Sequence, residues 1–81
     1  MPKFLVYKKS FIEILQYYGF VFKYQQGSHQ FWEGRINDKI RIVQVDVKYD
    51  YYSDSLLQIM IIQCGIDKRV FHKFRRTGKI I

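Results

Sequence analysis

Ser28 and His29 are the two residues of this chain whose types and position best suit chemistry. They follow Gly27, and Gln26-Gly27 predicts a tight hairpin turn because glycine adopts positive φ without steric cost. Both side chains would then lie at the start of a strand. Histidine titrates near neutral pH and can transfer a proton, so His29 is our candidate catalytic residue. A single strand histidine is more commonly a packed or solvated side chain, and that interpretation stays open.

The reaction that such a histidine suits is the cleavage of RNA. RNA carries its own nucleophile, the 2′-hydroxyl group, and cleavage requires an acceptor for its proton and positive charge beside the phosphate. No Cys and His cluster at zinc spacing is visible, and Asp46 and Asp50 are too few for a magnesium site. We therefore expect no metal and no cofactor. The second histidine, His72, stands among Lys and Arg and is expected on the surface.

The charge of the chain favours a polyanionic partner. Fourteen Lys and Arg against seven Asp and Glu give a net charge of +7. Nucleic acid is the expected polyanion, although an acidic protein would satisfy the same field. Six of the basic residues follow Ile66 and form either a phosphate-binding segment or a solvated C-terminus. The candidate RNA-binding residues are Ser28, Lys23, Arg41, Lys68, Arg69, Lys73, Arg75 and Arg76.

Cysteine use and hydropathy indicate the compartment. The single cysteine, Cys64, excludes an intramolecular disulfide and fits a reducing cytosol. It is expected to be a small buried side chain rather than a nucleophile. No secretory leader and no run of about 18 apolar residues is visible, so we predict a cytoplasmic protein without a membrane span. Residues 1–81 are predicted to form one domain with an arm over 1–8 and a basic tail over 75–81.

Three helices are expected. Ser10 and Glu13 have the spacing of a capping box, which predicts a helix over 10–18 that ends at Gly19. A second helix over 56–64 would be capped by Ser53 or Asp54 and would end at Gly65. A short third helix over 67–74 would begin at Asp67 as its N-cap and bury Val70, Phe71 and Phe74.

Three strands are expected between the first two helices. The alternating or β-branched segments 20–24, 29–34 and 39–47 predict an antiparallel meander, with turn residues over 34–38 and a polar loop over 49–53. The order α-β-β-β-α(-α) predicts an α+β sandwich in which helices cover one face of the sheet.

The sequence does not decide which face of the sheet carries His29. A turn at Gln26-Gly27 would pair Tyr24 with His29 and Phe22 with Phe31, which puts the histidine among aromatic side chains. A bulge or a three-residue turn would change that pairing.

Several of these segments together resemble the HicA toxin family, the small toxins of bacterial and archaeal toxin–antitoxin pairs. The chain has Gly19-Phe20 after the first helix, then Gly27-Ser28-His29, then Gly65-Ile66 after the second helix, and Phe71 soon afterwards. Members of the family typically show these motifs in this order. The resemblance extends over residues 9–74.

The resemblance implies a fold like that of double-stranded-RNA-binding domains, ribonuclease activity on mRNA, and an antitoxin, HicB, that blocks the toxin. It implies that His29 is the catalytic residue. Two positions depart from the family, because Gln30 and Asp46 stand where many members have histidine. The alternative is therefore a nucleic-acid-binding module of the same fold without catalysis. A third interpretation is a domain whose basic surface binds an acidic protein.

Overall fold

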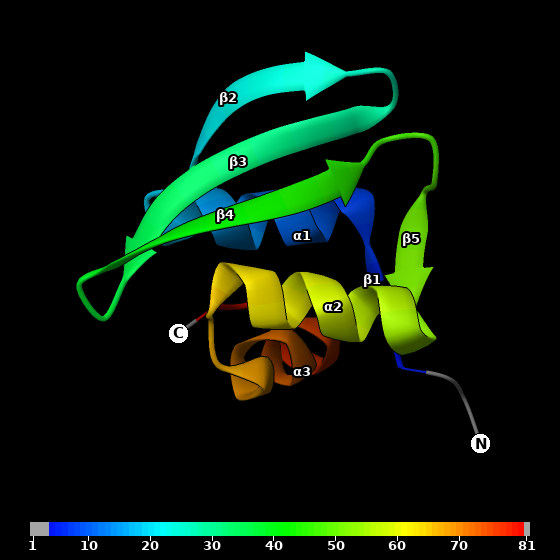
Figure 1. The fold of residues 1–81 in the computed structure, drawn as a ribbon. Coiled ribbons are helices and arrows are strands. Elements are labelled where there is room, and N and C mark those ends of the chain that lie inside the picture. Colours follow the sequence, from blue (N-terminus) through cyan, green and yellow to red (C-terminus); the bar gives the residue numbers. More distant parts are fainter. Residues whose placement is uncertain (1–3, 81) are drawn as a thin grey trace.

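The computed structural model describes residues 4–80 and has the α+β layout predicted from the sequence (Figure 1). In chain order the elements are β1 (Leu5–Tyr7), α1 (Lys8–Tyr17), β2 (Val21–Gln26), β3 (His29–Ile36), β4 (Lys39–Asp46), β5 (Tyr51–Ser53), α2 (Asp54–Cys64) and α3 (Lys68–Thr77). No helix in this part of the chain is long and apolar enough to cross a membrane.

The central sheet has the order β2-β3-β4 and is antiparallel. Gln26 pairs with His29, so the turn is Gly27-Ser28, and the predicted turn at Gln26-Gly27 is wrong by one residue. Gly27 has φ of 59°, which glycine adopts without a steric penalty. The predicted pairing of Tyr24 with His29 is wrong for the same reason, because Tyr24 pairs with Phe31.

An irregularity at Lys23 shifts the register of β2, so that Phe22 lies opposite Trp32, whereas an unbroken register would pair it with Glu33. The predicted pairing of Phe22 with Phe31 is wrong. Such a bulge inserts one residue on one strand and increases its twist. Strand β3 also continues to Ile36, two residues past the predicted end. The turn that follows is Asn37-Asp38, with φ of 52° and 63°, the backbone of a two-residue hairpin turn.

A second, two-stranded sheet was not predicted. Strand β1 pairs antiparallel with β5, with Val6 opposite Tyr52. The predictions of an arm over 1–8 and a loop over 49–53 are therefore wrong for residues 5–7 and 51–53, which are strands. Lys8 already belongs to α1. Residues 1–3 of the arm lie outside the described residues. Strands of three residues are too short to show an alternating pattern in the sequence.

Helix α1 begins earlier than predicted. Tyr7 is its N-cap and makes no side-chain capping bond, so the predicted capping box of Ser10 and Glu13 is wrong. The predicted end at Gly19 is confirmed. Gly19 has φ of 86°, its N–H donates to the Gln16 carbonyl at 3.0 Å, and the Phe20 N–H donates to the Leu15 carbonyl at 2.9 Å. This is a Schellman motif, and it places Phe20 in the core.

Gly65 ends α2 in the left-handed conformation and Asp67 caps α3, both as predicted. Ser53 is the N-cap of α2 but makes no side-chain capping bond, and the helix starts at Asp54. Helix α3 continues to Thr77, so the predicted basic tail is helical over residues 75–77. Residue 81 lies outside the described residues.

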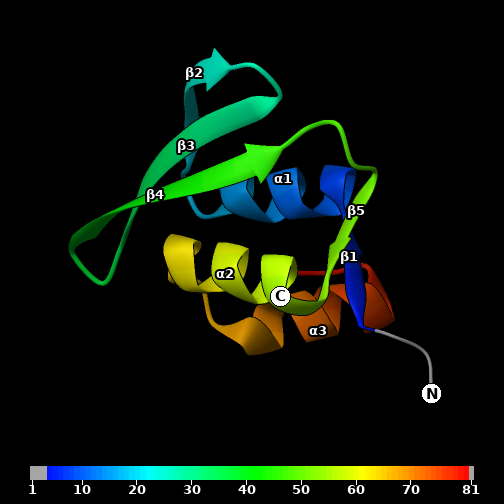
Figure 2. The ribbon, with the colours of Figure 1, turned by 45° about the vertical axis from the view of Figure 1, so that its right-hand side comes forward.

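The helices lie on one side of the sheet in two layers. Figures 1 and 2 show α1 and α2 directly beneath the sheet, with α3 beneath them. Trp32, Val43 and Val45 face these helices and are buried. Cys64 is fully buried in the same core, as predicted. The other face of the sheet is covered by none of the described elements (Figure 1).

Candidate functional site

His29 lies on the open face of the sheet. Side chains alternate along a strand, so His29 and Phe31 lie on the face opposite to the buried Trp32. Gln26 on β2 and Asp46 on β4 are its cross-strand partners. The structure therefore answers the question that the sequence left open, because His29 is not beneath the helices.

Asp46 is the one charged side chain that is buried among residues 4–80, with 8% of its surface exposed. Its carboxylate accepts the Lys48 backbone N–H at 3.2 Å and lies 3.9 Å from Lys48 Nζ. Burial alone would raise the pKa of Asp46. The Lys48 N–H, the Ser28 side chain, and the charges of Lys48 and His29 outweigh burial and lower that pKa overall.

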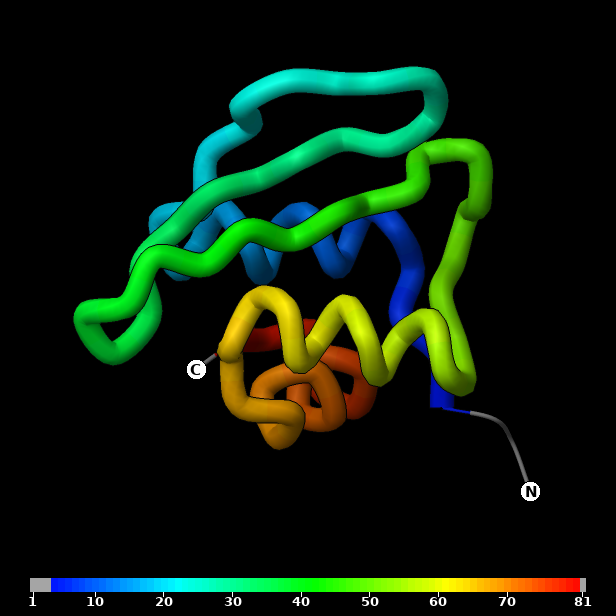
Figure 3. The backbone as a smooth tube through the Cα atoms, viewed as in Figure 1, coloured from blue at the N-terminus to red at the C-terminus, as the bar shows by residue number. Residues whose placement is uncertain are grey.

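Two hydrogen bonds fix the end of β4, one to the β2–β3 turn and one from β5. The Val47 N–H donates to the Ser28 carbonyl at 2.8 Å, and the Tyr52 hydroxyl donates to the Asp46 carbonyl at 2.7 Å. Figure 3 shows the turn and the end of β4 at the same end of the sheet. Burial, together with the charge of Asp46, raises the pKa of Tyr52. Ser28, His29 and Asp46 therefore form one cluster, which we call the His29 site.

His29 is half-buried, and its two ring nitrogens differ. Nδ1 is buried and has no hydrogen-bond partner. A buried nitrogen cannot meet a substrate from solvent, so Nε2 is the nitrogen available for proton transfer. The positive charge of this ring is one of the causes that lower the pKa of Asp46. The site can therefore accept a proton from a hydroxyl group brought to the open face.

Sequence reasoning missed Asp46 as a member of the site. In the sequence, Asp46 was considered as a possible magnesium ligand and as a position where many HicA proteins have histidine, but not as a neighbour of His29. The available signal was its place at the end of a strand of apolar residues, where the chain has to turn. Gln30, the other departure from the family, is on the opposite face from His29. Its side chain bonds Gln25 and Trp32, at 3.3 and 3.1 Å.

Most of the predicted RNA-binding cations lie far from the His29 site. Helix α3 is the layer farthest from the sheet in Figure 2. It carries Lys68, Arg69, Lys73, Arg75 and Arg76. Asp67 forms an ion pair with Arg69 at 2.7 Å, and Asp54 lines the same surface hollow as Lys68. The pairing with Arg69 lowers the pKa of Asp67 to about 2. The structure therefore does not bring these cations to His29.

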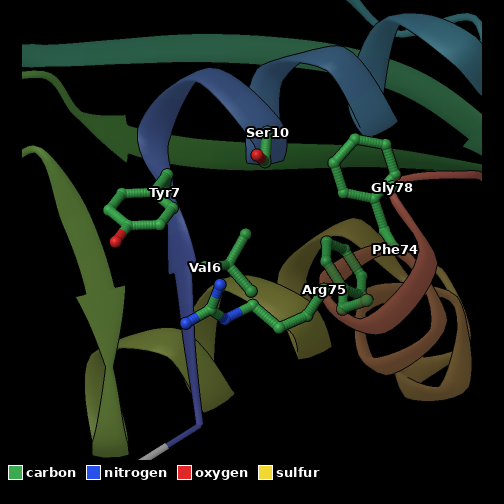
Figure 4. A pocket seen from close by; sticks show the side chains of 7 residues that line it. Val6, Tyr7, Ser10, Phe74, Arg75 and Gly78 are labelled. Atoms are coloured by element: carbon green, nitrogen blue, oxygen red, sulfur yellow. The ribbon is translucent and has the colours of Figure 1, made fainter.

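Arg75 is turned back toward β1. Its guanidinium lies 5.6 Å from the centre of the Tyr7 ring, a cation–π distance. Both residues line a pocket of about 230 Å³ between β1 and α3, which Figure 4 shows. His72, elsewhere on α3, is exposed as expected, and its ring stacks on the Phe4 ring with the ring centres 3.8 Å apart. Neither residue approaches the His29 site.

Arg41 and Lys23 occupy different surroundings. Arg41 faces the helices, and a Cβ atom on Gly65 would lie 2.8 Å from its Nε. Its charge therefore meets the C-terminus of α2, whose last turn has no basic residue. Burial raises the pKa of the nearby Cys64 thiol to about 11, which the charge of Arg41 partly opposes. Lys23 is exposed at the irregularity of β2.

Comparisons with known proteins do not identify the chain, since no protein-family model, no curated protein and no solved structure matches it. Within residues 4–80 no group of three or more His, Cys, Asp and Glu is placed to hold a metal ion. The resemblance to HicA therefore stays a prediction from sequence motifs, to be weighed with the geometry of the His29 site.

Proposed function

We propose that this domain is a HicA-like ribonuclease, the cytoplasmic toxin of a toxin–antitoxin pair, which binds mRNA and cleaves it with His29. The observation that carries the proposal is the His29 site itself. A half-buried histidine lies on an open face opposite a buried carboxylate, and the whole domain has a charge of +7. Perturbed acidic groups beside a histidine are typical of catalytic sites.

The proposed reaction begins when Nε2 of His29 takes the proton from the 2′-hydroxyl of the substrate. The freed 2′ oxygen attacks the adjacent phosphorus and forms a P–O bond, while the bond from phosphorus to the 5′ oxygen breaks. The 5′ oxygen takes a proton from solvent. The products are a 2′,3′-cyclic phosphate and a 5′-hydroxyl end. The carboxylate of Asp46 stabilises the imidazolium that forms on His29.

Positive charge contributes in two ways. Lys48 and Lys23 are exposed near the open face and can approach the phosphate groups of the substrate. The cations of α3 attract RNA at longer range through the field of the whole domain. In the free protein the Ser28 side chain forms a hydrogen bond with the Asp46 carboxylate, so its role is to hold Asp46 and not to bind RNA.

We also propose an acidic, HicB-like antitoxin that covers the His29 site. The net charge of +7 favours rapid association with an acidic protein, and that association would slow as salt rises. Co-expression with the adjoining open reading frame and co-purification test this partner. If no neighbouring gene product co-purifies, the toxin–antitoxin assignment fails.

The reaction is tested with three substrates of one sequence, namely RNA, its 2′-O-methyl form and DNA. Only the RNA has the required nucleophile, so we expect the purified protein to cleave RNA alone and to leave a cyclic phosphate. Cleavage should persist in the presence of a chelator. Cleavage of the 2′-O-methyl strand would contradict the mechanism.

A second candidate function is RNA binding without cleavage. The observation that favours it is the distance between the cations of α3 and the His29 site, since α3 could bind phosphate with no reaction nearby (Figure 2). A parent protein that binds RNA at low salt and never cleaves it would support this candidate over the ribonuclease.

A further inference from the structure

Two stacked aromatic side chains lie on the open face of the sheet. Tyr24 on β2 and Phe31 on β3 are cross-strand partners, with ring centres 4.6 Å apart and ring planes 13° from parallel. Tyr24 is 56% exposed. Since β2 is an edge strand, no other strand of the sheet flanks the second side of the Tyr24 ring. One flat aromatic surface is therefore open to a ligand.

This pair shares its face with the His29 site. Phe31 is two residues beyond His29, which corresponds to about 7 Å along a strand. The same hairpin holds a second aromatic pair, Phe22 and Trp32, in which Trp32 is buried against the helices. Burial of the core accounts for Trp32, and Phe22, which is 47% exposed, contacts the Trp32 ring edge-on. Burial of the core does not account for Tyr24 and Phe31.

We propose that Tyr24 and Phe31 form a stacking site for a nucleobase of single-stranded RNA, whose neighbouring phosphate lies at His29. This inference rests on the proposed function in taking RNA as the ligand. Every base has a flat face that can stack on an aromatic ring, whereas the bases of a duplex are already stacked on one another. The open face of the sheet therefore favours single-stranded RNA over duplex RNA at His29.

The charges around the pair fit this ligand. Lys23 precedes Tyr24 in the edge strand, and Lys48 lies beside Asp46, so both can reach phosphate groups at the margin of the face. On the face itself, Arg35 is accompanied by Glu33 and Asp46. The face is therefore close to neutral, and stacking rather than ion pairing holds the base there. Ile40 and Ile42 extend the apolar surface on the same face.

The test measures binding in a His29→Ala background, so that no RNA is cut. The probes are a fluorescein-labelled single-stranded oligoribonucleotide and the same strand annealed to its complement, both at low salt. Tyr24→Ala should weaken single-strand binding about 5- to 150-fold, the effect of losing one stacked base, and should leave duplex binding unchanged. Tyr24→Phe should bind like the parent. Tyr17→Ala removes an equally exposed tyrosine (51%) from α1 and is the matched control.

Single-strand affinity that is equal in Tyr24→Ala and Tyr17→Ala would overturn the stacking site, as would tighter binding of the duplex. A protein partner would then be the occupant of this face. Tyr24→Leu, which keeps apolar bulk without the π-system, should also weaken binding while its melting temperature matches that of the parent. The two proposals can fail separately, because this experiment measures binding and not cleavage. If the parent protein cleaves no RNA but its RNA binding depends on Tyr24, only the ribonuclease proposal fails. If the parent protein cleaves RNA and its RNA binding does not depend on Tyr24, only the stacking site fails.

Discussion

The His29 site and the exposed surface of α3 are built in opposite ways. At the His29 site the polar groups are few and enclosed, and the Asp46 carboxylate contacts Lys48 and Ser28. On α3 the cations are many and exposed, and Asp67 forms an ion pair with one of them, Arg69. What the His29 site can do depends on the geometry of its groups, and what the surface of α3 can do depends on how many charges it carries. In the sequence both regions are simply polar residues of a basic chain.

The attraction of RNA and its cleavage need not occur at the same place on the domain. Charges at α3 act over a Debye length of about 10 Å and are screened by salt, whereas proton transfer requires contact. If the two regions serve one RNA, substitutions in each should change different measured quantities. Four experiments test the two regions and the sheet that carries the His29 site.

The largest effect is expected from His29→Ala. Loss of general acid–base catalysis should lower the cleavage rate about 100- to 10,000-fold. RNA affinity and the melting temperature should barely change, because the ring is half-buried and its Nδ1 has no hydrogen-bond partner to lose. Melting, affinity and cleavage are measured on the same sample. Cleavage at the parent rate with an unchanged melt would remove His29 from the mechanism.

The next largest effect is expected from Gly34→Ala. A Cβ atom there would lie 2.5 Å from Cδ1 of the buried Phe20 ring, so overpacking should destabilise the fold by about 1–3 kcal/mol. Lys73→Ala on the exposed side of α3 should stay within about 0.5 kcal/mol of the parent. Urea unfolding measures both. The penalty at Gly34 should shrink in a Phe20→Leu background, and an undiminished penalty would contradict the clash with the ring.

A smaller effect is expected from the double substitution of Lys73 and Arg76 by Gln. We expect RNA affinity to fall on the order of tenfold, and the slope of log affinity against log salt to fall by about 0.7 per cation removed. The cleavage rate at saturating RNA should stay that of the parent. Lys39→Gln, at the β3–β4 turn, is the control. An unchanged salt slope in the double variant would show that α3 does not contact phosphate.

The smallest effect concerns acid stability, and it compares Asp46 with Asp67. Both carboxylates have folded-state pKa values below the ordinary 3.8, so each stabilises the fold above that pH and ceases to do so as the pH falls through its folded value. Asp46→Asn and Asp67→Asn should each flatten the loss of stability between about pH 5 and 2.

Salt should separate these two carboxylates, because one is exposed and the other is buried. Asp67 accepts its hydrogen bonds from Arg69 at the surface, where salt screens the charges of the pair, whereas Asp46 accepts its hydrogen bonds from Lys48 and Ser28 in a buried place that salt screens less. In high salt, Asp46→Asn should therefore still change how the melting temperature falls at acidic pH, whereas Asp67→Asn should not. Equal behaviour of the two variants would contradict the difference between an enclosed and an exposed site.

The helices and strands with strong local signals could be predicted from the sequence. Gly19 and Gly65 end their helices in the left-handed conformation, and Asp67 caps α3, because these are preferences of single residues. The capping box at Ser10 failed because pairing of β1 with β5 carries the chain into α1 two residues earlier. That pairing joins segments far apart in the sequence, and no local pattern reports it.

The candidate site was predicted only in part. His29 was recognised through its chemistry and its glycine turn, but its face depended on which of the alternating residues of β3 lie beneath the helices, and Trp32 is the one that is buried there. Asp46 on β4 lies opposite His29 on β3, so predicting that they are neighbours required knowing how these two strands pair. The cations of α3 were grouped with His29 because the sequence shows sign and number of charges. It does not show which layer of the fold carries them.

The pairing of β1 with β5 also sets the order in which the chain can assemble. Leu5 pairs with Ser53, so this contact closes a far longer loop than the two-residue turn that joins β3 to β4. The entropy of loop closure makes such contacts late in folding. We expect pulse-labelled amides of β3 and β4 to gain protection before those of β1 and β5. On the ribosome, the first strand to emerge then waits for a partner nearly fifty residues away, and is the last to be paired.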